Sequence, residues 1–134
     1  MRYLDRLQPL ALLVLRFVLG AIMIAHGCGK VFGGMQKFSH MVSSLGIPGW
    51  MAYLAAAAEF GGGILIVIGL LTRLAALAIL IDMLVAISKV HLKNGLMGQG
   101  GYEFPMAVAA IAFALVFFGA GPIALDHIRG GSST

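Results

Sequence analysis

The chain has 134 residues, of which 60% are hydrophobic and only 10% are charged, and its mean hydropathy is +1.01. Soluble domains are usually about 45–50% apolar and about 25% charged, so this composition excludes a water-soluble monomer. One cysteine excludes a disulfide framework, and the net charge of +4 comes without the basic runs that bind nucleic acid. We therefore expect an all-α protein whose partner is the lipid bilayer, with no nucleic acid.

Four apolar stretches predict a single transmembrane domain, because one crossing of the hydrocarbon core needs about 20 helical residues. Only Thr72 and Arg73 separate the second stretch from the third, which predicts a tight antiparallel hairpin. The first stretch begins like a signal peptide, but Arg16 interrupts its apolar core and its length is that of a span, so we expect it to be retained. The prediction is a polytopic four-helix bundle over residues 1–134, with spans near residues 9–29, 51–71, 74–92 and 105–121.

The two longer loops differ in character. In the first, Phe38, Met41, Val42 and Leu45 follow helical spacing, which predicts a short half-helix lying in the membrane interface. The second, residues 93–104, is rich in glycine and can pack closely over the mouth of the bundle. The side of the termini carries one more cation than the side of the two long loops. By the positive-inside rule this favours both termini in the cytoplasm, with the long loops facing the periplasm or the exterior.

Arg16, Glu59 and Asp82 lie inside the predicted spans, where a charge costs at least about 2.5–3.5 kcal/mol and is normally paired or functional. At 1.5 Å per residue, Arg16 and Asp82 fall roughly 10 and 12 Å from the side of the termini, which predicts a buried ion pair between them. This pair either fixes the register of two helices or also serves the function. Glu59 falls roughly 18 Å in, on a small-residue face and without a partner at its depth. It is therefore either protonated or exposed to a wet cavity shared with Lys89.

Further polar residues are expected at the mouth opposite the termini. Lys89 lies two turns from Asp82 on one helical face, and His26 and Lys30 are four residues apart on the first span. His91 falls opposite Asp82 on a regular helix, so it joins this cluster only if that helix end unwinds. The candidate ligand site combines the polar residues of the mouth with the midplane carboxylate: Glu59, His26, Lys30, Lys89, His91, Tyr102 and Glu103.

No motif for a resident cofactor is present in the sequence. Haem and iron–sulfur clusters need paired axial ligands or four cysteines, and no compact metal-ligand motif occurs, so we expect no metal. The lone Cys28 also cannot run the two-cysteine relay of disulfide-generating membrane enzymes.

Several segments resemble a known family. The run LRFVLGAIMIAHGCGKVFGG, the segment YLAAAAEFGGGILIVIGLLTRLAAL and the motifs KVHLKNG and GGYEFP are similar to the DoxX family of small bacterial membrane proteins, over about residues 15–126. The resemblance implies a four-helix bundle in the cytoplasmic (inner) membrane. It also implies an association with redox systems: a membrane subunit of thiosulfate:quinone oxidoreductase, oxidative-stress membrane complexes and quinone-stress operons. The family's recurring polar positions match Arg16, His26, Gly27, Lys30, Glu59, Arg73, His91, Asn94, Gly95, Tyr102 and Glu103.

The preferred interpretation is an integral membrane subunit of a redox-associated assembly, linked to quinone. In this hypothesis His91, Lys89 or His26 donates a hydrogen bond to a quinone oxygen, and Glu59 or Glu103 exchanges the proton. Electrons then come from a partner or from a quinone, and whether the chain itself is catalytic stays open. Two alternatives also stay open: a non-catalytic structural or accessory subunit docking onto a larger membrane complex, and a small-solute or proton carrier acting as a dimer.

Overall fold

The computed structural model describes residues 1–130, and over that range the chain is helical with no β-strand. Within this range, three continuous helical stretches are long and apolar enough to cross a membrane, and α6 is a shorter apolar helix of 16 residues. The chain is thus an all-α membrane protein, as predicted. Its elements are α1 (Arg2–Asp5), α2 (Gln8–Gly29), η1 (Lys30–Gly34), α3 (Met35–Ser44), α4 (Met51–Ile68), α5 (Thr72–Ala86), η2 (Ile87–His91), η3 (Leu92–Asn94), α6 (Glu103–Phe118) and α7 (Leu125–Gly130).

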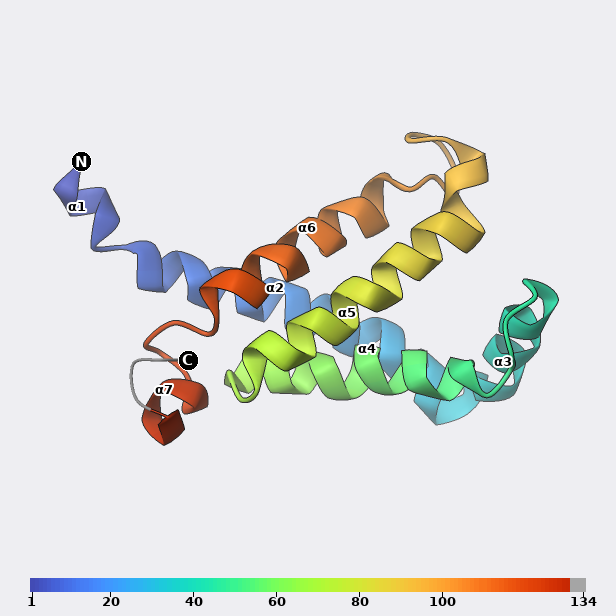
Figure 1. The fold of residues 1–134 in the computed structure, drawn as a ribbon, viewed down its shortest axis with the longest axis horizontal. Helices are drawn as coiled ribbons and strands as arrows, with labels where there is room; N and C mark the ends of the chain where they lie inside the picture. Colours follow the sequence, from blue (N-terminus) through green and yellow to red (C-terminus); the bar gives the residue numbers. More distant parts are fainter. Residues whose placement is uncertain (131–134) are drawn as a thin grey trace.

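Four apolar helices form the body of the molecule (Figure 1). Helix α2 packs along α4, α4 lies beside α5, and α5 packs along α6. Helices α1 and α7 lie at one end, whereas α3 and the loop before α6 lie at the other (Figure 1). The core between the helices is apolar, and its largest members are at most 1% exposed: Leu19, Met23, Ile66, Ile79 and Leu115.

Glycines allow α2 and α4 to approach closely. A Cβ at Gly27 would lie 2.5 Å from the backbone nitrogen of Phe60, and a Cβ at Gly20 would lie 2.8 Å from the carbonyl oxygen of Gly63. No real side chain tolerates such distances from a backbone, so both positions require glycine. Small residues at a helix contact are a usual means of packing helices within membranes.

A kink joins α2 to α3 and directs α3 back toward α4, so that α3 forms one wall of the candidate site. The helix breaks at Phe32 and Gly33, and Gly33 adopts a φ of 148°, which favours glycine. Helix α3 then turns back to pack against α4. The predicted amphipathic half-helix is confirmed as a helix, with Val42 buried and Met41 exposed, while its depth in a membrane stays a prediction.

Candidate functional site

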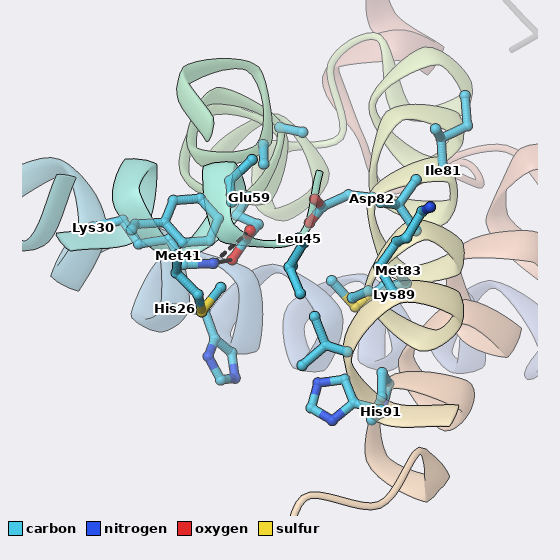
Figure 2. Close-up of a pocket in the computed structure, with 18 of the residues that line it drawn as sticks. His26, Lys30, Met41, Leu45, Glu59, Ile81, Asp82, Met83, Lys89 and His91 are labelled. Atoms are coloured by element: carbon cyan, nitrogen blue, oxygen red, sulfur yellow. Dashed lines mark hydrogen bonds and ion pairs between the residues drawn. The ribbon is translucent and has the colours of Figure 1, made fainter. Parts of the chain in front are cut away.

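A cavity of about 950 Å³ lies at the end of the molecule opposite α1 and α7. It is bounded by α3, α4, α5 and the loop before α6, and its walls are mostly apolar (Figure 2). This volume falls within the range of about 300–1,000 Å³ found for small-molecule sites, which are typically apolar with a few placed polar groups. Here the polar groups are His26, Lys30, Glu59, Asp82, Lys89, His91 and Glu103.

Lys30 and Glu59 form an ion pair at the inner wall of this cavity. The Nζ atom of Lys30 donates to both carboxylate oxygens of Glu59, at 2.7 and 2.8 Å, and Glu59 is only 3% exposed. The same Nζ lies 4.1 Å from the ring centroid of Phe38, which stabilises the ammonium further. The prediction that Glu59 has no partner at its depth is therefore wrong, because α2 packs closely on α4 at Gly27 and brings the following turn, with Lys30, beside Glu59.

Asp82 extends this ion pair from the neighbouring helix. Its carboxyl points from α5 toward the Glu59 carboxyl on α4 (Figure 2). Its Oδ2 atom is buried and receives no hydrogen bond from the described residues. One ammonium and two carboxyl groups, carried on three helical segments, thus meet inside the bundle.

The predicted ion pair between Arg16 and Asp82 is wrong. Arg16 is turned inward and is 2% exposed, but its guanidinium binds backbone carbonyls near the end of the bundle where α7 lies. The first turns of α2 project beyond α4 (Figure 1), so counting from the span end placed Arg16 too deep in the bundle. Carbonyls in the last turn of a helix lack intrahelical partners, which makes them ready acceptors. The acceptors are Ile66 from Nε at 2.9 Å, Val67 from Nη2 at 2.7 Å, and Ala120 and Ile123 from Nη1 at 3.2 and 2.6 Å.

Asp126 completes this second polar network, although it was not singled out from the sequence. Its carboxylate accepts hydrogen bonds from the backbone nitrogens of Leu71 and Thr72, at 2.7 and 2.8 Å, and it attracts the Arg16 guanidinium. A carboxylate at a helix N-terminus is favourable, and here it stabilises the start of α5. The sequence signal for Asp126 was that it is a single acidic residue following the last apolar stretch. This network locks the helix ends together and lies away from the cavity.

His91 faces the cavity because its helix departs from α geometry. The chain after Ala86 forms a wide π-helical turn, η2, and then a 3₁₀ turn, η3, so the condition set for His91 is met. Its Nδ1 lies 2.8 Å from the carbonyl oxygen of Gly100, and the Asn94 side chain donates to the same oxygen at 2.9 Å. The two side chains thereby hold the glycine-rich loop over the cavity.

The remaining candidates divide between the cavity mouth and its surroundings. Lys89 and Glu103 line the cavity and are largely exposed there. His26 also lines it, with its ring centroid 5.8 Å from that of Phe104. Tyr102 is not among the lining residues, so the structure does not bring its side chain to this site.

Within residues 1–130, no group of three His, Cys, Asp or Glu side chains is placed to hold a metal ion. Cys28 is a free, exposed thiol. The carboxyl, ammonium and imidazole groups that line the cavity can form hydrogen bonds, pair with charges and exchange protons.

Comparison with known proteins places the chain in a family. The family model named DoxX matches residues 11–92, a range that includes Lys30, Glu59 and Asp82. The chain belongs to the DoxX family. Among the relatives of this DoxX-family protein is one named "Putative oxidoreductase CatD" from Bacillus subtilis, which is 36% identical over 114 residues, covering 85% of this chain and 83% of the relative.

Two further relatives extend the comparison. The inner membrane protein YqjF of Escherichia coli is 37% identical over 76 residues, covering 55% of this chain and 56% of the relative. A protein of Haemophilus influenzae is 32% identical over 135 residues, covering 95% of this chain and 96% of the relative. No solved structure matches the chain significantly.

Proposed function

We propose that this DoxX-family protein binds a quinone in the cavity and serves as a membrane subunit of a redox-associated assembly. One observation carries the proposal: a largely apolar cavity of about 950 Å³ has the buried Glu59 carboxylate, paired with Lys30, at its inner wall. The apolar walls suit the ring and tail of a quinone, and the polar groups suit its two oxygens.

Reduction of a quinone to a quinol takes up two electrons and two protons. The side chains of Lys89, His26 and His91 lie at the cavity and can donate hydrogen bonds to a quinone oxygen. The carboxyl groups of Glu59 and Glu103 line the same cavity and can exchange protons. In this proposal a partner subunit supplies or accepts the electrons.

The comparisons support the redox assignment and the location. One relative is named "Putative oxidoreductase CatD", and another is named "Inner membrane protein YqjF". We place this chain in the bacterial inner membrane, with both termini in the cytoplasm and the cavity toward the opposite face. Positive-inside counting supports this orientation by one cation.

Titration of the purified protein in lipid nanodiscs with ubiquinone-1 or menadione tests the proposal. We expect saturable binding, and about tenfold weaker binding by Lys89→Met, equivalent to about 1.4 kcal/mol for one hydrogen bond from a charged donor. Lys93→Met is the matched control, since Lys93 is exposed and does not line the cavity. Absence of saturable binding by the unmodified protein would overturn the proposal.

The alternative functions predict other outcomes in the same preparation. A non-catalytic accessory subunit would copurify with a larger membrane complex in mild detergent, bind no quinone and tolerate Glu59→Gln and His91→Ala. A dimeric carrier would catalyse uptake of a solute or protons into proteoliposomes. Quinone binding together with copurification of a redox partner supports the proposal made here.

A further inference from the structure

Three helical segments bring one ammonium and two carboxyl groups together beside the cavity. Lys30 follows α2, Glu59 lies on α4 and Asp82 lies on α5. Both oxygens of Glu59 already accept hydrogen bonds from Lys30, at 2.7 and 2.8 Å. The Asp82 carboxyl points toward the Glu59 carboxyl (Figure 2), and its buried Oδ2 receives no hydrogen bond from the described residues.

Counting charges shows what this arrangement requires. With both carboxyl groups ionised, the cluster carries a net negative charge among membrane helices, and two carboxylates face each other with no hydrogen between them. Like charges this close cannot both remain ionised without a large penalty. One proton makes the cluster neutral and turns the contact between Asp82 and Glu59 into an O–H···O hydrogen bond. Lys30 then balances the charge that remains on the pair.

The other charged groups of the cavity do not neutralise the second carboxylate of this cluster. Lys89 is the second cation on the same helix as Asp82, but it is exposed and forms no ion pair within residues 1–130. His26 and Glu103 are exposed at the mouth, and His91 is engaged with the carbonyl oxygen of Gly100. Apolar side chains form most of the remaining wall.

We propose that Glu59 and Asp82 share one proton as an acid pair, with Lys30 as counter-ion, and that this pair exchanges a proton with the ligand in the cavity. Asp82 thereby gains a role in the site in place of the structural one expected from its predicted pairing with Arg16. The acid pair stands on its own geometry, whereas its exchange with a quinone rests on the proposed function.

Infrared spectroscopy of the protein in nanodiscs, without quinone and at neutral pH, tests the acid pair. A protonated carboxyl gives a C=O band well separated from the bands of carboxylates. The chain has only five acidic residues, so labelling the side-chain carboxyl carbon of aspartate or of glutamate with ¹³C identifies the source. We expect one such band in the unmodified protein, shifted by one or both labels. Its absence would overturn the acid pair, even where every variant failed to fold.

Two variants distinguish a shared proton from a single buried acid. Asp82→Asn removes the group, so the band disappears. Glu59→Gln leaves Asp82 as the only carboxyl beside Lys30, so Asp82 ionises and the band disappears as well. A band that persists in Glu59→Gln, with the variant folded by size-exclusion chromatography, would contradict sharing. Asp5→Asn, at an exposed position, is the control and retains the band.

Addition of ubiquinone-1 to the same samples separates the two proposals. If the ligand contacts the pair, the band shifts in the unmodified protein. If the protonated-carboxyl band is present but no quinone binds, the proposed function is refuted and the acid pair is retained. If quinone binds but the band is absent, the acid pair is refuted and the proposed function is retained. A band that does not shift when quinone binds refutes proton exchange with the ligand.

Discussion

The ion pair between Lys30 and Glu59 predicts a large energetic coupling. Lys30→Met leaves an almost fully buried carboxylate without its cation, and breaking a buried pair in this way typically costs about 3–5 kcal/mol. The Lys30 side chain is 26% exposed, and Glu59 can take up a proton, so we expect a cost at the lower end, about 3 kcal/mol. Glu59→Gln costs less, about 1–2 kcal/mol, because the ionised Asp82 carboxylate can then replace Glu59 as the partner of the Lys30 ammonium.

The double variant should recover much of this loss. Lys30→Met with Glu59→Gln leaves no unpaired charge at the site, so we expect a coupling of about 2 kcal/mol between the two substitutions. Titration with sodium dodecyl sulfate in mixed micelles measures the free energy of unfolding of the four proteins. The control cycle combines Lys89→Met with Glu103→Gln, which line the same cavity without an ion pair within residues 1–130.

The two cycles must differ if the structure is right. The control cycle should show a coupling below about 0.5 kcal/mol, the usual limit for independent sites. A coupling this small for Lys30 and Glu59 would refute the reasoning, because the two groups would then not compensate each other. A coupling of similar size in both cycles would indicate a general electrostatic interaction among the charges of the cavity and not a specific ion pair between Lys30 and Glu59.

Three further substitutions test other parts of the structure. Asp126→Ala removes two hydrogen bonds from the start of α5 and should lower the free energy of unfolding by about 2–3 kcal/mol. The control Asp5→Ala, at an exposed position, should change that free energy by less than about 0.5 kcal/mol. Gly27→Ala should destabilise the contact between α2 and α4 by about 1–3 kcal/mol, but Gly29→Ala meets open space and should be neutral or stabilising in the same titration. His91→Ala should speed amide hydrogen exchange in the glycine-rich loop, measured by mass spectrometry, without lowering protection in the helices.

Helix positions follow closely from hydropathy in this chain. Helix α4 begins at Met51, the predicted start of the second span, and the predicted amphipathic segment forms α3. Apolar stretches and glycine breaks are local signals, so a sequence carries them directly. Whether the 16-residue α6 crosses the bilayer stays a prediction, since its length alone is marginal for a span.

The pairing of buried charges was much less predictable. Counting residues from span ends treats every helix as straight and flush with its neighbours. The projection of α2 moves Arg16 to the end of the bundle, and the close approach of α2 to α4 at Gly27 places Lys30 beside Glu59. Both are properties of helix packing, which no local pattern specifies. The sequence therefore identified most of the charged residues that matter, but it wrongly paired Arg16 with Asp82 and left Glu59 without a partner.

Photoaffinity labelling with an azidoquinone tests the central claim most directly, because it reports where a quinone sits. If a quinone binds in the cavity, labelled peptides should come from its wall, around Met41 on α3 and Val85 on α5, and excess ubiquinone-1 should suppress the labelling. Labelling confined to the outward phenylalanines of α6, Phe113 and Phe117, and insensitive to ubiquinone-1, would contradict the claim that the cavity is the quinone site.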